Sequence, residues 1–180
     1  MKIDWDWALG CMDFAFQPIV NIHTGVCFGC EALLRGWEGA GFTSIAQVFD
    51  KAYEEGVLFT IDRTLKDAAI EKYLSITNHQ QLKLFLNLDN RAVTMPENYQ
   101  GLTSDIFLRY GLNAGSICLE LSERHTFPSL RDAKVTLGHY KHQAFKIAID
   151  DFGTGFSGLQ LLYHAEPDFI KMDRFFISGI

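Results

Sequence analysis

The amino-acid sequence predicts an α/β domain in which helices cover a largely parallel sheet. Short runs rich in β-branched and aromatic residues alternate with longer amphipathic runs along the chain. This alternation is typical of βα units, which pack their helices against a parallel sheet. It leaves two architectures open, a doubly wound sheet and a closed (β/α) barrel.

Composition and charge restrict the class of protein. The chain has 180 residues, 48% of them hydrophobic, which is enough for one domain with a sizeable core over residues 1–180. The formal net charge of -6 argues against binding a nucleic-acid polymer but is compatible with an anionic ligand neutralised by metal ions or arginine. No apolar run has the length of a membrane span, and "MKIDWDWALG" lacks the apolar core of a signal peptide. We therefore expect a cytoplasmic segment without membrane contact, which is compatible with a membrane-tethered parent protein.

The predicted elements follow one another in a regular order. Six segments carry the β-branched, aromatic or continuous apolar residues of buried strands: 14–20, 26–36, 82–89, 116–123, 145–151 and 168–173. Four segments have helical patterns: 44–56, 60–76, 104–111 and 129–143. Ser44 is the expected N-cap of the first of these helices, and Gly56 is its expected end.

Polar side chains recur on one face of the predicted strands. In residues 145–151, Ile147 and Ile149 share one face and Asp150 lies on the other. The same parity places Glu120 opposite its apolar neighbours and puts Glu31 in phase with Arg35. In a barrel this face is the interior, and the carboxyl ends of the strands surround the mouth where active sites lie.

Five residues on this face, together with Asp151 beside Asp150, are expected to converge at the barrel mouth: Glu31, Asn87, Glu120, Asp150, Asp151 and Lys171. Hard oxygen ligands in this number suit Mg²⁺ or Mn²⁺ better than zinc. Two adjacent ions would need about this many carboxylates, and the neighbouring Asp150 and Asp151 could reach both. The glycines of "FGTGFSG" predict a tight, movable loop beside the site.

Simpler structural roles are the alternatives for single residues, because Asp and Asn are common turn residues and Glu and Arg are commonly in surface ion pairs. Those alternatives are a turn at Asp150 and Asp151, a strand-ending Asx turn at Asn87 and Asp89, and ion pairs of Glu123 with Arg124 and of Arg35 with Glu38.

The cysteine spacing argues against a metal or redox site. Cys27 and Cys30 are three residues apart in a predicted strand, so their side chains point to opposite faces. We therefore interpret Cys11, Cys27, Cys30 and Cys118 as small apolar residues.

Six motifs follow one another along the chain: "FQPIVNIHTG", "CEALLRG", "FLNLD", "LELSE", "IAIDDFGTGFSGLQLL" and "FIKMD". Together, from about Phe14 to Phe176, they resemble the EAL domains of bacterial cyclic-di-GMP phosphodiesterases. The resemblance implies a TIM-like (β/α) barrel whose first strand is antiparallel to the rest. About six of its eight strands fall within these residues, so we expect an incomplete barrel with exposed edges and, from those edges, either a homodimer or an aggregation-prone chain.

The resemblance also implies a role for each site residue. Glu31, Asn87, Glu120, Asp150 and Asp151 would be metal ligands, and Lys171 would act with Glu31 and Asp150 in catalysis by holding or activating water. Gln17, Leu33 and Arg35 would bind the substrate, Arg35 through a phosphate, and Glu123 would anchor the glycine-bearing loop. "NLD" stands where the family usually has "NLS", which leaves Asn87 intact.

The implied activity is the hydrolysis of cyclic di-GMP to linear pGpG in bacterial signalling, with two Mg²⁺ or Mn²⁺ ions. Two alternatives stay open: a receptor that binds cyclic di-GMP without cleaving it, and a protein-interaction module that keeps only the fold.

Overall fold

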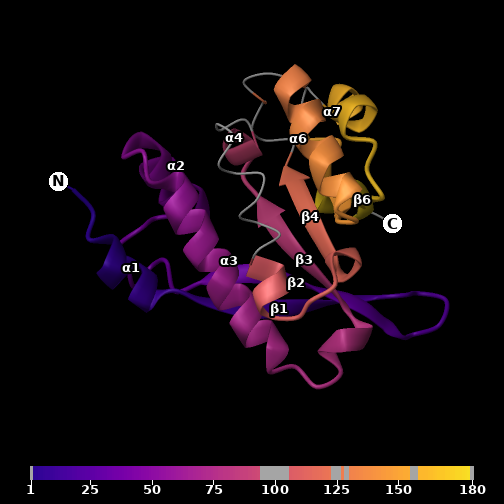
Figure 1. Cartoon of the computed structure of the whole chain (residues 1–180), viewed down its shortest axis with the longest axis horizontal. Helices are drawn as coiled ribbons and strands as arrows, with labels where there is room; N and C mark the ends of the chain where they lie inside the picture. The colour runs from indigo at the N-terminus through magenta and orange to yellow at the C-terminus, as the bar shows by residue number, and fades with distance from the viewer. Residues whose placement is uncertain (1, 94–105, 123–126, 128–129, 155–157, 179–180) are drawn as a thin grey trace. The chain divides into compact units, whose positions relative to one another are not determined.

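The described part of the chain begins with a short helix and an antiparallel strand pair. A computed structural model describes residues 2–93, 106–122, 127, 130–154 and 158–178 (Figure 1). Contacts divide the chain into two units, Met1–Leu84 and Phe85–Ile180. The first unit contains α1 (Trp5–Cys11), β1 (Asp13–Val20), β2 (Cys27–Arg35), α2 (Ile45–Glu54), α3 (Leu58–Leu74), η1 (His79–Gln81) and the first two residues of β3 (Lys83–Leu88).

The β1–β2 pair shows the side-chain alternation that the sequence predicts. Its register is antiparallel and places Gln17 opposite Glu31. On β2 the buried residues Cys30, Ala32 and Leu34 alternate with half-buried Glu31 and Leu33. Because strand side chains alternate, Glu31 lies on the less buried face of β2, opposite the face of Cys30 and Ala32. Helix α3 packs against β1 (Figure 1).

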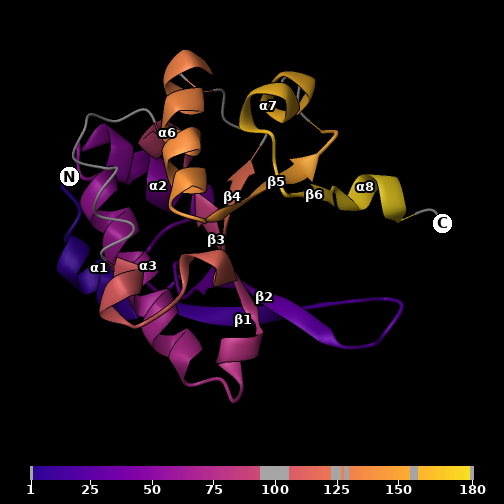
Figure 2. The same ribbon diagram turned by 45° about the vertical axis from the view of Figure 1, so that its right-hand side comes forward.

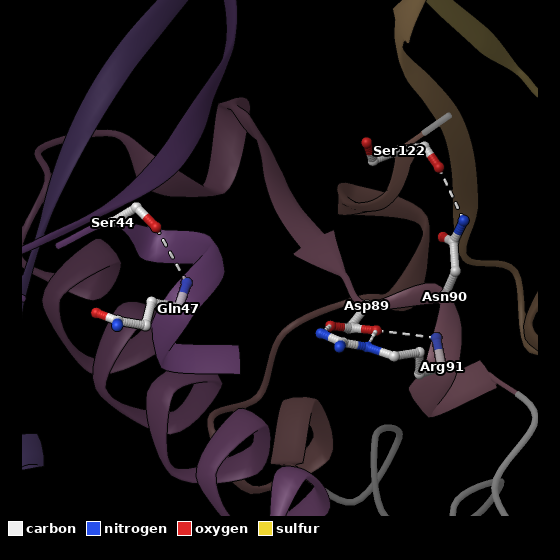
Figure 3. Close-up of polar contacts among 6 residues, drawn as sticks. All are labelled: Ser44, Gln47, Asp89, Asn90, Arg91 and Ser122. Atoms are coloured by element: carbon white, nitrogen blue, oxygen red, sulfur yellow. Dashed lines mark hydrogen bonds and ion pairs between the residues drawn. The ribbon is translucent and has the colours of Figure 1, made fainter. Parts of the chain in front are cut away.

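The two long helices of the first unit lie within two residues of the expected bounds. The Oγ of Ser44 accepts a hydrogen bond from the Gln47 backbone N–H at 3.1 Å (Figure 3), which confirms Ser44 as the N-cap of α2. Gly56 follows the helix with a φ of +71°, a conformation that glycine adopts readily.

Helix α1 was not predicted from the sequence. It has only seven residues, and the Asp4 side chain caps it by accepting from the Trp7 N–H. A distant residue holds its start, because Trp5 Nε1 donates to Glu55 Oε2 at 3.0 Å. This hydrogen bond also holds the pKa of Glu55 below its ordinary value. A helix this short depends on tertiary contacts, which periodicity does not show.

The second unit contains a run of parallel strands. Its elements are the rest of β3, α4 (Asn90–Val93), η2 (Ala114–Ser116), β4 (Ile117–Ser122), α6 (Leu130–His142), β5 (Lys146–Phe152), α7 (Gly158–Ala165), β6 (Phe169–Met172) and α8 (Arg174–Ile177) (Figures 1 and 2). Strands β4, β5 and β6 pair in parallel. Their apolar parity is fully buried in β4 and β5, as Ile117, Leu119, Ile147 and Ile149 show.

One of the longer helices of the second unit was not predicted. The predicted helix 104–111 is helical at residues 106–109, and residues 104 and 105 lie outside the described residues. Helix α7 was missed, although Leu161 and Ala165 form a buried i, i+4 pair while Leu159 and Tyr163 stay exposed. Its eight residues follow a glycine-rich segment that was interpreted only as a loop.

The order of the strands distinguishes the two architectures that the sequence left open. Strand order follows chain order within each unit, β1-β2 in the first and β3-β4-β5-β6 in the second. A doubly wound sheet reverses its order at a switch point, whereas a barrel adds each strand beside the previous one.

Among the described residues, no helix combines the length and the apolar character that a membrane crossing needs.

Candidate active site

Three charged side chains meet on neighbouring strands of the second unit. Lys171 on β6 places its Nζ 2.7 Å from Glu120 Oε1 on β4 and 3.0 Å from Asp150 Oδ1 on β5. The two carboxylates each offer an oxygen within 4.8 Å of the other. Glu120 is fully buried, while the Asp150 and Lys171 side chains are 20% and 25% exposed.

Strand register explains why these side chains meet. In the parallel β4–β5 pair Glu120 lies opposite Ala148, and Ser122 lies opposite Asp150. Residues opposite each other in a sheet project from the same face, so Glu120 and Asp150 share a face near the carboxyl ends of their strands. Lys171 belongs to the half-buried parity of β6, together with Phe169.

The Asp150–Asp151 pair lies in a β-bulge. Ile149 pairs with Ile170 and Phe152 pairs with Met172. Between these two pairs β5 advances by three residues while β6 advances by two, so β5 contains one extra residue. The extra residue interrupts the strict alternation that sends neighbouring side chains to opposite faces. Asp151 has a φ of +53°, a conformation that Asp tolerates better than most residues. The carbonyl of Asp151 accepts a hydrogen bond from the Thr154 N–H, so Asp151 does begin a turn, as the simpler alternative proposed.

Gly153 is required by this turn. Its φ is +102°, and a Cβ at this position would lie 2.5 Å from Phe176 Cε2. The first glycine of "FGTGFSG" therefore allows close packing of an aromatic ring. Residues 155–157, on which the rest of the predicted loop falls, lie outside the described residues.

The carboxyl end of β3 carries a second polar cluster. Asn87 is exposed on β3. Asp89 accepts from the Arg91 backbone N–H at 2.9 Å, which is the Asx turn that the alternative reading proposed for Asp89. Its carboxylate also holds the Arg91 guanidinium through two hydrogen bonds, of 2.9 and 2.6 Å (Figure 3). Asn90, between them, donates from Nδ2 to the Ser122 carbonyl at 2.8 Å.

The remaining candidate residues of the described chain lie in the first unit. Glu31 and Leu33 are half-buried on β2, whereas Gln17 on β1 and Arg35 at the end of β2 are exposed. Arg35 Nη1 donates to the Leu34 carbonyl at 2.8 Å. Glu123, the expected loop anchor, lies outside the described residues.

The charge balance of the strand-end cluster favours a cation. Glu120 and Asp150 bring two carboxylates to one lysine, so these three groups sum to one negative charge. A buried carboxylate is costly unless it is paired or bound to a metal ion. Among the described residues, the groups at this cluster that could hold a metal ion are carboxylates, and such oxygen donors fit Mg²⁺ or Mn²⁺ better than zinc.

The cysteines differ in their burial. All four are free thiols, and Cys30 and Cys118 are buried as expected, whereas Cys11 and Cys27 are half-buried. Burial raises the pKa of the Cys30 thiol to about 11, so that the thiol stays protonated and unreactive near neutral pH.

Comparison with known proteins places this geometry in a family. The model of the EAL domain matches residues 8–180. Among curated proteins of Escherichia coli K12, the chain is 29% identical over 178 residues to the probable cyclic di-GMP phosphodiesterase PdeI, and 28% identical over 167 residues to the probable cyclic di-GMP phosphodiesterase PdeB. These matches cover 96% and 92% of this chain, but only 22% and 32% of the relatives, so the chain spans a third or less of their length.

A solved structure confirms the predicted fold class. BlrP1 of Klebsiella pneumoniae, in a manganese and cyclic di-GMP complex, is 27% identical and matches with a TM-score of 0.79. The match covers 94% of this chain and 42% of that one. Its calcium and cyclic di-GMP complex matches with a TM-score of 0.77. The TIM-like (β/α) fold with an antiparallel first strand is therefore correct, and β1 is that strand.

Two polar contacts at the carboxyl end of β3 were not predicted from the sequence. Asn90 and Arg91 were given no role there, and Asp89 was interpreted only as a turn residue. A sequence signal was present, since Asp and Asn directly after a predicted strand favour side-chain hydrogen bonds to the backbone. The partner of Asn90 is thirty-two residues away, however, so no local pattern could identify it.

Proposed function

The chain belongs to the EAL-domain family, and we propose that it hydrolyses cyclic di-GMP to linear pGpG with the help of divalent metal ions. One observation carries the proposal: Glu120, Asp150 and Lys171 meet at the carboxyl ends of three parallel strands. The names of PdeI and PdeB and the ligands of the BlrP1 complexes support the choice of substrate. Active sites of (β/α) barrels lie at this end of the strands.

Five side chains would hold the ions: Glu31, Asn87, Glu120, Asp150 and Asp151. All offer hard oxygen ligands, and the β5 bulge gives adjacent Asp150 and Asp151 more freedom to turn toward one face than a regular strand would. When bound, Mg²⁺ or Mn²⁺ would polarise the phosphate and lower the pKa of water, and two ions would suit an in-line displacement.

The chain's own residues would orient the substrate and the water. Arg35 would bind a phosphate through its guanidinium, and Gln17 and Leu33 would contact the nucleotide. Lys171, with Glu31 and Asp150, would position the water that attacks phosphorus. One P–O bond to a ribose 3′ oxygen breaks as the new P–O bond forms, and that oxygen takes up a proton, which gives one linear dinucleotide. Glu123 would anchor the loop after Asp151.

Chromatographic detection of pGpG tests this function directly. The chain is incubated with cyclic di-GMP and with Mg²⁺, Mn²⁺ or EDTA, and Asp150→Asn serves as the control. We expect pGpG with either ion, and none with EDTA or with the variant. Binding of cyclic di-GMP in calorimetry without any pGpG would support the receptor instead. Absence of both would leave the interaction module.

Self-association is proposed on a separate observation. The exposed residues of β6 and α8 include Ile170, Met172 and Phe175, which are 45%, 50% and 77% exposed. Exposed apolar side chains that lie close together favour burial against a second copy. Light scattering should show a dimer, and a monodisperse monomer would refute this part of the proposal.

A further inference from the structure

We propose that Asn90 is a positioning residue for the metal site, because its side chain ties the carboxyl end of β3 to the carboxyl end of β4. This inference rests on the proposed function, since it assigns Asn90 to the centre that Asn87, Glu120 and Asp150 would form. Asn90 itself would not contact an ion.

The tie is a buried hydrogen bond to the backbone. Asn90 is 2% exposed, and its Nδ2 donates to the Ser122 carbonyl at 2.8 Å (Figure 3). Ser122 is the last residue of β4, two residues after Glu120, and it lies opposite Asp150 in the β4–β5 register. A single side chain thus fixes the β4 end beside both carboxylates.

Asn90 is held just as firmly on its own side. The Asp89 carbonyl accepts from the Ala92 N–H at 2.9 Å, which closes the turn that begins α4. The Asp89 carboxylate accepts hydrogen bonds from the backbone N–H and from the guanidinium of Arg91. The Asp89 side chain is only 6% exposed and that of Arg91 15%. Because this turn starts two residues after Asn87, its hydrogen bonds also hold the strand end that presents Asn87.

The Asn90 hydrogen bond should determine how precisely the metal ligands are positioned. Ligands from different strands must hold their relative positions within a fraction of an ångström to share an ion, and outer residues that orient ligands typically change metal affinity by about 10- to 100-fold. The Asn90 hydrogen bond joins the strand carrying Asn87 to the strand carrying Glu120. Loss of the donor should let these ends separate without removing any ligand.

Two variants at Asn90 separate the hydrogen bond from packing. Asn90→Ala removes the donor and most of the side chain, whereas Asn90→Asp keeps the shape but brings a carboxylate toward the Ser122 carbonyl. Asn113→Ala is the matched control, because the Asn113 side chain accepts from the Gly115 N–H at 2.8 Å just before the amino end of β4. It removes one asparagine bond to the backbone at the opposite end of the same strand.

Mn²⁺ affinity by calorimetry and amide hydrogen exchange without metal are measured on all four proteins, with thermal melts to confirm folding. We expect both Asn90 variants to bind Mn²⁺ at least about tenfold more weakly and to exchange faster at the carboxyl end of β4, while Asn113→Ala matches the wild type in Mn²⁺ affinity. Wild-type affinity in either Asn90 variant would overturn the inference and leave the proposed function standing. A wild-type chain that binds no Mn²⁺ would overturn the proposed function itself.

Discussion

Lys66 of α3 and Lys171 of β6 both contact carboxylates, but they differ in burial and in the number of carboxylates that they contact. In the first unit, Lys66 pairs with Asp62 one turn earlier on the same helix, and their side chains are 6% and 7% exposed. In the second unit, Lys171 contacts Glu120 and Asp150, which come from two other strands. The helix pair has one carboxylate per lysine, and the strand-end cluster has two.

This difference separates a structural ion pair from a candidate site. The Asp62–Lys66 pair is neutral and follows from the i, i+4 spacing of a helix, so it needs no further ion. The strand-end cluster forms only when three strands come together, and it gathers more negative charge than its lysine balances. Such an arrangement is unfavourable for stability alone, because one lysine cannot balance two carboxylates that are largely shielded from water. We infer that the strand-end cluster of Glu120, Asp150 and Lys171 is retained because it binds a cation.

The largest expected effect comes from Asp150→Asn. A neutral amide cannot balance the charge of a cation as a carboxylate does, so Mn²⁺ affinity and pGpG formation should both fall by more than the roughly 100-fold that outer residues cause. Calorimetry and chromatography measure the two quantities. Unchanged Mn²⁺ affinity would remove Asp150 from the metal site and with it the contrast between the clusters.

Lys171→Met tests the role of the lysine within the cluster. Without ions the variant should be less stable than the wild type, because Glu120 and Asp150 lose their cation. Mn²⁺ should restore that stability and bind at least as tightly as before, while hydrolysis falls by roughly 100-fold or more. Thermal melts with and without Mn²⁺ distinguish this from a structural role, in which the ion would rescue nothing.

Lys66→Met should lower stability and leave the chemistry alone. It leaves the buried Asp62 without its lysine, which typically costs about 3–5 kcal/mol of unfolding free energy. The double variant Asp62→Leu, Lys66→Met should recover most of this loss. Urea unfolding measures stability, and pGpG formation at a temperature where all variants are folded should be unchanged. A selective loss of turnover would show that the α3 pair is not merely structural.

The Arg35→Ala substitution removes an exposed guanidinium that donates a hydrogen bond to the Leu34 carbonyl. If its guanidinium binds a substrate phosphate, affinity for cyclic di-GMP should fall about 10- to 100-fold, and Mn²⁺ affinity should not change. Calorimetry with each ligand gives both values. Arg35→Lys is the control, since it keeps the charge but loses the bidentate geometry. Equal nucleotide affinity in all three proteins would exclude Arg35 from the site.

The smallest effect is expected at the exposed pair of Lys146 and Asp168, where one lysine again meets one carboxylate. Burial alone would raise the pKa of Asp168, but hydrogen bonds from Lys146 and from the Ile147 N–H hold it below its ordinary value of 3.8. A lowered pKa contributes stability above pH 3.8 that disappears as the pH falls through the folded value. Asp168→Asn should therefore cost about 1 kcal/mol near neutral pH and progressively less in acid. An equal cost at every pH would mean that the charge is irrelevant.

Much of the fold could be predicted from the sequence because it depends on short-range patterns. The alternation of Cys30, Ala32 and Leu34 with Glu31 identifies the faces of β2, and the Ser44 and Gly56 signals mark the ends of α2. The parity that separates Asp150 from Ile147 and Ile149 comes from the same local geometry. Helices α1 and α7 escaped prediction, since seven or eight residues give too little periodicity and α1 needs Glu55, far along the chain.

The strand face on which each polar residue lies was therefore determined by the sequence itself, because the alternation of side chains depends only on neighbouring residues. Which strands lie side by side, the bulge that places Asp151 at positive φ, and the bond from Asn90 to Ser122 were decided by the tertiary structure. These features join residues that are distant in the chain, and their energies arise only when the backbone has folded. The same reason makes Lys171 a partner of two carboxylates, whereas Lys66 finds its partner within one turn of its own helix.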